Sequence, residues 1–302
     1  MKALFAVDGT TGCDAAVRQG GRLLNAQSDE AILYFALPEV TVRHASSNEA
    51  MRDRARKAIA DAVFEQAKQN LPGVLATNAG CVTDEHLAAD GILRAADQCT
   101  ADLVVVGACG AGVVDRFLLG SVSRGLVQCT KRPVLVVRPS PENRKNQPLR
   151  ILLAYDGSSS CTTALKTAEQ LSLLADTEVI AATVVEPLSI GKVPDWILNK
   201  ARDTDTEAMA QTWQREHDND KQQARDQLAE FMGKQPAPFN KAEIVVCEGN
   251  AAEQILSLVE QRQVDLIIMG TRGFGLLQRF LIGSTSDKVL NYAPCSVLLA
   301  RE

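Results

Sequence analysis

Residues 102–123 read DLVVVGACGAGVVDRFLLGSVS, and residues 265–286 read DLIIMGTRGFGLLQRFLIGSTS. Eleven residues of the first stretch recur in the second at a constant offset of 163 positions, among them Gly107, Gly110, Gly112, Arg116, Phe117, Leu118, Gly120, Ser121 and Ser123. A segment repeated at a fixed offset indicates that one structural unit is present twice. The chain is therefore expected to contain two similar structural units, each about half its length.

An apolar run that ends in Asp-Gly marks the beginning of each unit: LFAVDGTTGCDAAV starts at Leu4 and ILLAYDGSSSCTTAL at Ile151. Asp8 and Asp156 are only 148 positions apart, so about 15 residues have been added to the second unit, and we place this insert in the polar residues 190–220. The connecting PSPENRKNQP holds three prolines and cannot contribute to a core. We expect a first domain over residues 1–138, a linker over 139–149 and a second domain over 150–302.

Composition places the chain among ordinary globular proteins. Of its 302 residues, 46% are hydrophobic, and 32 Lys and Arg against 37 Asp and Glu give a net charge of −5. This balance indicates neither disorder nor a nucleic-acid surface, and the excess acid lies in the second unit, much of it in residues 195–230. No stretch approaches the roughly 20 apolar residues that span a bilayer, and Asp8 comes too early for a secretory signal, so we expect a cytoplasmic protein without membrane contact.

Cysteine and histidine show no metal-binding pattern. The eight cysteines are scattered singly, with no Cys-x-x-Cys pair, at positions 13, 81, 99, 109, 129, 161, 247 and 295. We expect them to be reduced and mostly buried, the alternative being metal or disulfide roles. His44, His86 and His217 have no partner pattern and are interpreted as surface or core residues.

Each unit alternates short apolar strands with helical patterns. We expect strands at residues 3–7, 31–37, 74–82, 103–106 and 134–137 in the first unit, with a helix over 49–71, and at 151–154, 178–184, 243–246, 266–269 and 297–299 in the second. Strands that are apolar throughout and separated by helices form parallel sheets covered on both faces. The sequence therefore predicts two doubly wound α/β domains.

Ligands bind to such sheets outside the carboxyl ends of the strands, where the strand order reverses. Asp8 and Asp156 lie just past the first strand of each unit. Just past the fourth strand comes the segment Gly-x2-Gly-x9-Gly-Ser, formed by Gly107, Gly110, Gly120 and Ser121 and again by Gly270, Gly273, Gly283 and Ser284. Glycines let backbone N–H groups approach phosphate oxygens, and the following helix offers its positive end to an anion. The candidate hydroxyls are Ser121, Ser123, Ser284 and Ser286.

Several alternatives stay open at these positions. Glycines punctuate any strand-to-helix turn and serines cap helices. Asp-Gly after a strand is a common turn, so Asp8 and Asp156 either shape a turn or contact a hydroxyl or metal near a nucleotide. Arg116 and Arg279 either reach terminal phosphates or lie in solvent or at an interface. No P-loop, GxGxxG, HExxH or GxSxG motif is present.

Together these residues resemble the universal stress proteins, in the tandem form with two such domains in one chain. The resemblance rests on AVDGTTG and AYDGSSS, on the two glycine segments, and on the closing strands KRPVLVVR and APCSVLLAR, and it covers nearly the whole chain. It implies two five-stranded parallel sheets in the Rossmann-like, adenine nucleotide α-hydrolase-like arrangement. It also implies ATP, with Mg²⁺, as the ligand.

The resemblance also implies roles for single residues, since in the nucleotide-binding branch the first-strand Asp and a second-strand residue hold adenosine, and the glycine segment holds the phosphates. The matching positions are Asp8, Gly107, Gly110, Gly120, Ser121 and Val122 in the first domain, and Asp156, Val184, Gly270, Gly273, Gly283, Ser284 and Thr285 in the second. Two positions depart from the pattern. Ala36 stands where the family often has Val, and Thr83 and Asp84 stand near the place taken by Gly249 in the second domain, so we expect the second site to match the family more closely.

Family members dimerise through the final strand, whose unpaired edge is otherwise a liability. We expect the two copies to pair with each other about a pseudo-twofold, with a homodimer through the acidic insert left open. The expected function is that of an ATP-binding stress-response protein with at most slow hydrolysis, because only Asp8, Asp156, Arg116 and Arg279 are candidates for the groups that a fast ATPase needs. The alternatives are a scaffold with structural glycine loops, and an ATP-using transferase or pyrophosphatase, whose sequence segments are absent.

Overall fold

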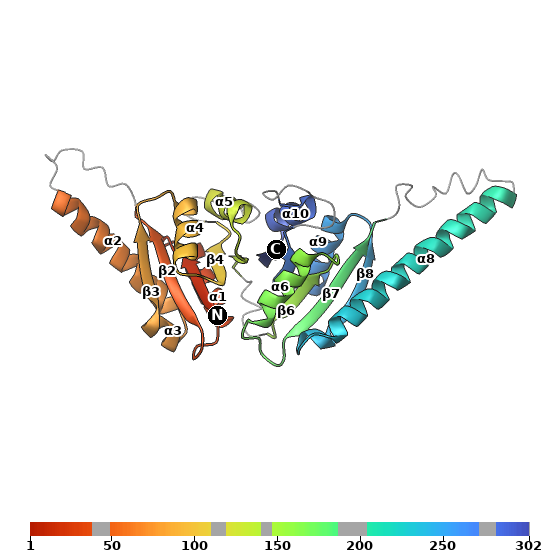
Figure 1. Cartoon of the computed structure of the whole chain (residues 1–302), viewed down its shortest axis with the longest axis horizontal. Helices are drawn as coiled ribbons and strands as arrows, with labels where there is room; N and C mark the ends of the chain where they lie inside the picture. The colour runs from red at the N-terminus through yellow and green to blue at the C-terminus, as the bar shows by residue number, and fades with distance from the viewer. Residues whose placement is uncertain (38–48, 110–118, 140–146, 187–203, 272–281, 302) are drawn as a thin grey trace.

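The structure, a computed structural model, describes residues 1–37, 49–109, 119–139, 147–186, 204–271 and 282–301 (Figure 1). Within these ranges, strands and helices alternate through each half. The first half contains β1 (Lys2–Ala6), α1 (Thr11–Arg22), β2 (Glu30–Ala36), α2 (Glu49–Asn70), α3 (Gly73–Asn78), β3 (Gly80–Asp84), α4 (Ala88–Gln98), β4 (Leu103–Gly107), α5 (Ser121–Cys129) and β5 (Val134–Val137). The second half contains β6 (Arg150–Ala154), α6 (Ser159–Glu169), β7 (Glu178–Val185), α8 (Thr204–Gly233), the short 3₁₀ helix η2 (Phe239–Lys241), β8 (Glu243–Glu248), α9 (Ala251–Arg262), β9 (Leu266–Gly270), α10 (Ser284–Tyr292) and β10 (Ser296–Ala300).

Each half forms a five-stranded parallel sheet. The strand order is β3-β2-β1-β4-β5 in the first half and β8-β7-β6-β9-β10 in the second. Every pairing inside a half is parallel. The central strands β4, β6 and β9 are buried at four or all five of their residues, which explains why they consist of continuous apolar runs rather than alternating patterns. The predicted fold class of two doubly wound parallel sheets is confirmed.

The two sheets join at their final strands. β5 pairs with β10 in the antiparallel sense, with Val136 opposite Val297, Leu135 opposite Leu298, and Val134 opposite Leu299. The result is one ten-stranded sheet whose halves are related by an approximate twofold through this junction (Figure 1). Backbone groups that would be exposed along two sheet edges are thereby paired.

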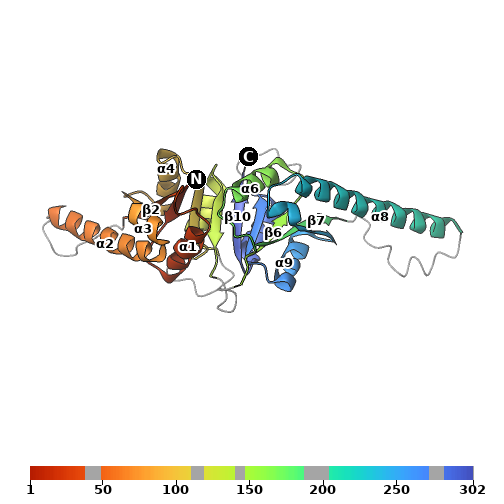
Figure 2. The same ribbon diagram turned by 90° about the horizontal axis from the view of Figure 1, so that it is seen from below.

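Helices cover both faces of the twisted sheet (Figure 2). On one face, α1, α2, α3, α6 and α8 contribute buried apolar residues to a single cluster that runs through both halves. On the other face, α4, α5, α9 and α10 do the same. The helix that follows the first strand and the helix that follows the fourth strand therefore lie on opposite faces in each half. None of the described helices is long and apolar enough to cross a membrane.

One predicted strand was wrong over most of its length. Residues 74–82 were expected to be extended, but residues 73–78 form α3, and β3 begins at Gly80. Pro72 precedes this helix, where its fixed φ favours a first turn, and its carbonyl accepts a hydrogen bond from the N–H of Ala76 at 3.0 Å. Leu75 is buried while Val74 is 52% exposed, so the two adjacent apolar residues belong to a helical turn.

The extra residues of the second half lie between β7 and β8. Residues 186–242 separate these strands, a stretch of 57, whereas residues 37–79, a stretch of 43, separate β2 from β3. Much of the difference is helical, because α8 has 30 residues and its counterpart α2 has 22. Both helices extend outward from the sheet (Figure 1). Residues 190–203 of the expected insert lie outside the described residues.

The junction strand supplies a test of the core. Leu298 is fully buried in β10, opposite Leu135, and its truncation leaves a cavity at the join of the two sheets. We expect Leu298→Ala to lower the free energy of unfolding by about 2–5 kcal/mol in urea denaturation. The control is Leu174→Ala, at a side chain that is 72% exposed, which should change it by less than about 0.5 kcal/mol. Equal effects of the two variants would contradict this assignment of the core.

Candidate functional site

The carboxyl ends of β1 and β4 form the crevice at which the strand order of the first half reverses. These two strands are neighbours, and the same holds for β6 and β9 in the second half. Their following helices leave toward opposite faces, which opens a crevice between them. The structure thus places the Asp8 turn beside the end of β4, and the Asp156 turn beside the end of β9.

Asp8 and Asp156 each organise the turn that follows the first strand. Asp8 Oδ1 accepts hydrogen bonds from Thr10 N at 3.0 Å and Thr10 Oγ1 at 2.6 Å, and Asp156 Oδ1 accepts one from Ser158 N at 2.9 Å. The intervening glycines have φ values of +74° and +77°, which L-residues adopt only with strain. Both aspartates are nevertheless exposed, so the turn role leaves their carboxylates accessible at the crevice.

The same turns cap α1 and α6. Thr10 Oγ1 accepts from Cys13 N at 3.3 Å, and Ser158 Oγ accepts from Cys161 N at 3.1 Å. Burial raises the pKa of Cys13 to about 11 and that of Cys161 to about 12, so both thiols stay protonated at neutral pH. The first turns of α1 and α6 are therefore satisfied within the protein.

The first glycine of each segment has a packing role. A Cβ at Gly270 would lie 2.8 Å from Cys161 N and 2.7 Å from Ser160 Cβ, so β9 ends against the first turn of α6 with no room for a side chain. At Gly107 the nearest atom would be Gly12 O, at 3.2 Å. Close packing therefore accounts for the glycine at position 270, and the contact at position 107 is tight but longer.

The helices that follow the glycine segments, α5 and α10, begin without the side-chain caps of α1 and α6. The N-cap residues of α5 and α10 are Gly120 and Gly283, and neither helix has a side-chain capping hydrogen bond. Ser121 and Ser284, the first residues of these helices, are exposed, and Val122 and Thr285 are half-buried. First-turn N–H groups without a capping side chain attract an anionic acceptor at the positive end of the helix.

Ser123 and Ser286 hold these helices to the sheet. Ser123 Oγ donates to Gly107 O at 2.7 Å, and Ser286 Oγ donates to Gly270 O at 2.8 Å. Both side chains are buried, with 3% and 4% exposure. Their hydroxyl protons are thus used inside the protein, which separates these two candidates from the exposed Ser121 and Ser284.

The second and third strands show where the two halves differ. Ala36 and Val184 occupy equivalent positions near the carboxyl ends of β2 and β7. Ala36 pairs with Asp84, and Val184 pairs with Cys247. His86 and Gly249 each lie two residues further on, so His86 is the first-half counterpart of Gly249, whose φ is +125°. The helix after Gly249 is capped by Asn250 Oδ1, which accepts from Glu253 N, whereas α4 in the first half has no side-chain cap.

Two histidines pair with carboxylates near this end of the sheet, which the sequence did not indicate. His217 Nε2, on α8, lies 3.1 Å from Glu248 Oε2, and Lys221 Nζ lies 3.4 Å from the same oxygen. These contacts, that with His217 foremost, lower the pKa of Glu248. In the first half, His86 Nδ1 pairs with Asp84 Oδ1 and lowers the pKa of that carboxyl.

Several predicted positions lie outside the described residues: Gly110, Gly112, Arg116, Gly273, Arg279 and His44. Across the described part of the chain, no three His, Cys, Asp or Glu side chains converge to hold a metal. None of the eight cysteines forms a disulfide, but the expectation that most are buried was wrong. Only Cys13, Cys161 and Cys295 are buried, whereas Cys81 and Cys129 are exposed and the other three are half-buried.

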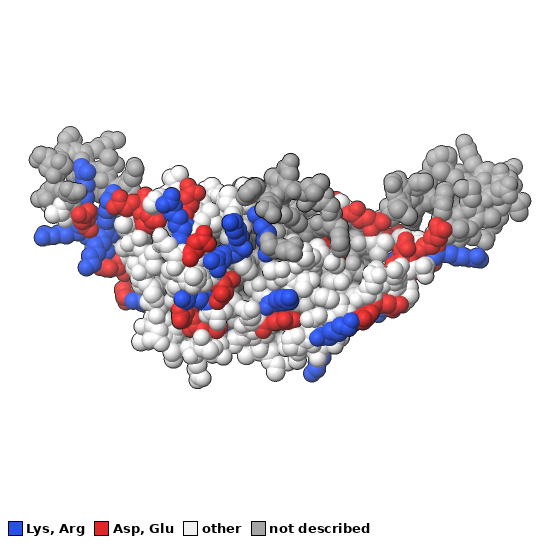
Figure 3. Space-filling model, in the orientation of Figure 1, with Lys and Arg blue, Asp and Glu red and all other residues white. Residues whose placement is uncertain are grey.

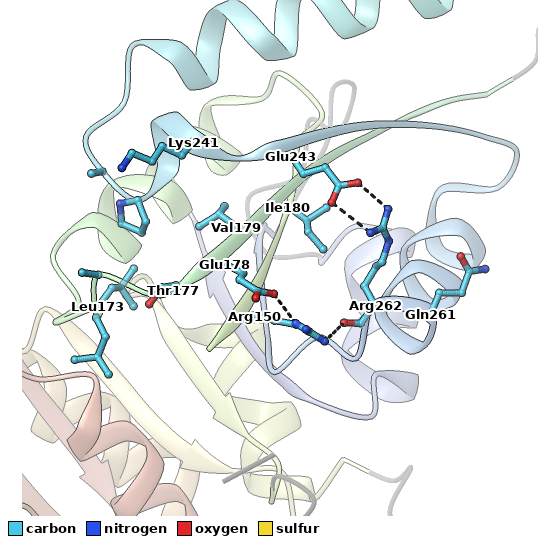
Figure 4. A pocket seen from close by; sticks show the side chains of 14 residues that line it. Arg150, Leu173, Thr177, Glu178, Val179, Ile180, Lys241, Glu243, Gln261 and Arg262 are labelled. Carbon is cyan, nitrogen blue, oxygen red and sulfur yellow. Dashed lines mark hydrogen bonds and ion pairs between the residues drawn. The ribbon is translucent and has the colours of Figure 1, made fainter. Parts of the chain in front are cut away.

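A separate hollow of about 730 Å³ lies at the opposite edge of the second half (Figure 4). It is lined by the amino ends of β6, β7 and β8, where Arg150 Nε donates to Glu178 Oε2 at 2.6 Å and Arg262 Nη2 donates to Glu243 Oε1 at 2.7 Å. These ion pairs already satisfy the guanidinium groups that face the hollow. It shares no residue with the crevice that contains Asp156 and Gly270.

Charge on the surface is mixed in sign. On the face shown in Figure 3, Lys and Arg side chains lie interspersed with Asp and Glu. No broad basic surface of the kind that tracks a nucleic-acid backbone is visible among the described residues on this face.

Comparison with known proteins agrees on one family. The model of the "Universal stress protein family" matches residues 1–138 and 149–301. A universal stress protein of Mycolicibacterium smegmatis is 25% identical over 306 aligned positions, covering 99% of this chain and 96% of the relative. One from Thermus aquaticus, described as lying in the 3′ region of a QAH/OAS sulfhydrylase, is 33% identical over 151 positions, which are 50% of this chain and 97% of that protein. The crystal structure of a universal stress protein from Archaeoglobus fulgidus superposes with a TM-score of 0.61 at 19% identity, covering 99% of this chain and 98% of that one.

The packing role of the first glycines predicts unequal effects of one substitution. At Gly270 a methyl group would meet backbone at 2.8 Å, whereas at Gly107 it would meet the carbonyl of Gly12 at 3.2 Å. We expect Gly270→Ala to lower the free energy of unfolding by about 1–3 kcal/mol, and Gly107→Ala by less, in chemical denaturation. A larger loss in Gly107→Ala would contradict this reading of the two strand ends.

The Glu248 contacts predict a pH dependence. Because its pKa is lowered on folding, Glu248 stabilises the protein above its unfolded pKa of about 4.3, and this contribution is lost as the pH falls through the lower folded pKa. The difference in stability between wild type and Glu248→Gln should therefore be fully present above about pH 5 and shrink below about pH 4, measured by urea denaturation. Glu260→Gln, at an exposed position of α9, is the control, and its difference from wild type should stay constant.

Proposed function

The chain belongs to the universal stress protein family, with two copies of the family's domain in tandem, and on this premise we propose that it binds ATP at the crevice of each half. Nucleotide occupancy then alters its conformation or its choice of partner in a stress response, with at most slow hydrolysis. The proposal concerns a regulatory, nucleotide-binding protein of the cytoplasm.

The observation that carries the proposal is the way α5 and α10 begin. α1, α6 and α9 have Thr, Ser and Asn caps, whereas α5 and α10, like α3 and α4, have no side-chain cap, and α5 and α10 follow glycine N-caps, Gly120 and Gly283, beside the crevices. A phosphate oxygen can accept from first-turn N–H groups that a capping side chain would otherwise satisfy. Both sites have this feature at equivalent positions, which favours a common anionic ligand.

The remaining residues of each crevice supply the other parts of a nucleotide site. The exposed hydroxyls of Ser121 and Ser284 stand at the first helical positions and are placed to donate to phosphate oxygens, together with the backbone at Val122 and Thr285. The exposed Asp8 and Asp156 would contact the ribose or Mg²⁺, which neutralises phosphate charge when bound with the nucleotide. Val184 would border the adenine in the second half, where the smaller Ala36 leaves more room in the first.

A second candidate function is a partner-binding scaffold that takes no nucleotide. Two observations favour it: Gly107 and Gly270 are explained by close packing, and the hydroxyls of Ser123 and Ser286 are used within the protein. Neither observation accounts for the uncapped first turns of α5 and α10. We therefore rank the scaffold second, and titration of the chain with ATP separates the two.

Carboxylates at the first helical positions test the nucleotide sites. Ser121→Asp and Ser284→Asp each place a negative charge where a phosphate would bind, while favouring the helix they begin by about 0.3–1 kcal/mol. We expect each variant to bind one equivalent of ATP fewer than wild type, since the remaining affinity at the altered site should fall at least tenfold. Calorimetric titration of the full chain gives the stoichiometry.

The matched controls are Ser121→Asn and Ser284→Asn, which keep the size of the new side chain without its charge. Both should retain two equivalents, with thermal unfolding midpoints close to those of the Asp variants. Unchanged stoichiometry in both Asp variants would show that the phosphates do not bind at these helices. The absence of ATP binding and of ATP-induced stabilisation in wild type would favour the scaffold instead.

A further inference from the structure

Each half ends in a buried arginine that crosses to the other half. Arg138 directly follows β5 and Arg301 directly follows β10, and they are only 4% and 8% exposed. Because β5 and β10 run antiparallel, the end of each strand lies beside the beginning of its neighbour. Arg138 N accordingly donates to Ser296 Oγ, at 3.2 Å, on the first residue of β10.

The side chain of Arg138 reaches the carboxyl end of α10. Its Nη2 donates to Leu290 O at 2.9 Å and to Asn291 O at 3.3 Å. These carbonyls belong to the last turn of α10, where no further helical N–H follows to donate to them. A first-half residue thus caps the helix whose amino end forms the second half's candidate phosphate site.

The side chain of Arg301 makes the reciprocal contact. Its Nη1 donates to Gln128 O at 3.2 Å and its Nη2 to Val127 O at 3.4 Å, in the last turn of α5. Val127 and Gln128 are the positions that correspond to Leu290 and Asn291 at the repeat offset of 163 residues. The equivalent two carbonyls of α5 and of α10 are therefore each capped by an arginine of the opposite half. Arg124 Nη2 adds a direct bond from α5 to Asn291 Oδ1 of α10, at 2.7 Å.

An arginine that holds the carboxyl end of a short helix also holds the position of its amino end. α5 and α10 have nine residues each, so about 13 Å separates a C-terminal guanidinium from the first-turn N–H groups. A cation at the carboxyl end offsets the negative end of the helix dipole and stabilises the last turn of the helix. It also fixes the axial position of the helix, on which the direction of those N–H groups depends.

We propose that Arg138 and Arg301 are crossed positioning residues: Arg301 sets the first half's phosphate site through α5, and Arg138 sets the second half's site through α10. This proposal rests on the proposed function in that the ligand is the phosphate chain of a nucleotide. It adds that neither half possesses a complete site by itself. Each site requires an arginine that lies at the far end of the other half's sequence.

The test uses full-length chains in which one site is blocked. In the Ser284→Asp background only the first site takes ATP, and Arg301→Gln should weaken its affinity about three- to tenfold, more than Arg138→Gln does. In the Ser121→Asp background the order should reverse. Arg301→Lys and Arg138→Lys keep the charge and should recover part of each loss. A merely structural role for the arginines would weaken both sites alike.

Hydrogen exchange without nucleotide provides a second readout. Arg301→Gln should accelerate exchange of the α5 amides more than those of α10, and Arg138→Gln should do the opposite. The proposal would be overturned if the ATP affinity of a site depended most on the arginine of the same half, or equally on both arginines. It would also be overturned if Arg301→Gln did not act mainly on the α5 amides and Arg138→Gln mainly on those of α10. Crossed exchange in a chain that binds no nucleotide would retain the positioning role and overturn the proposed function.

Discussion

Three residue pairs across the junction, Val136 with Val297, Leu135 with Leu298 and Val134 with Leu299, join two five-stranded sheets into one. A final strand left as an edge would expose a row of unpaired backbone groups, and antiparallel pairing between copies removes two such edges at once. The antiparallel sense has a geometric consequence as well. It places the end of each final strand beside the other half, which is why Arg138 lies against α10 and Arg301 against α5.

Glycine has two separate roles in the segments that first revealed the repeat. Gly107 and Gly270 let the end of the fourth strand approach the first helix closely, while Gly120 and Gly283 leave the first turns of α5 and α10 without a capping side chain. The spacing of the glycines in the sequence does not separate these two roles, since either role requires a glycine at the same position of each copy. The contacts separate them, because a Cβ at Gly270 would collide with backbone whereas the N-cap positions border the crevice.

The sequence predicted the fold well because its signals are local. Continuous apolar strands, Asp-Gly turns and a fixed repeat offset gave the parallel sheets and brought Asp8 toward Gly107 and Asp156 toward Gly270. The expectation for residues 74–82 was wrong because the adjacent apolar residues Val74 and Leu75, of which only Leu75 is buried in the helical turn, resemble the start of a strand. The pairings of His217 with Glu248 and of Arg138 with Leu290 depend on tertiary packing between distant segments, for which the sequence carries no periodic signal.

The central claim is that this tandem chain has two nucleotide sites, one at each strand-order reversal. Mass spectrometry of the unaltered chain under non-denaturing conditions tests it most directly, because it counts bound molecules without assuming which residues hold them. We expect species carrying one and then two ATP molecules as the nucleotide concentration rises. A spectrum that keeps the mass of the unliganded chain at every concentration would contradict it.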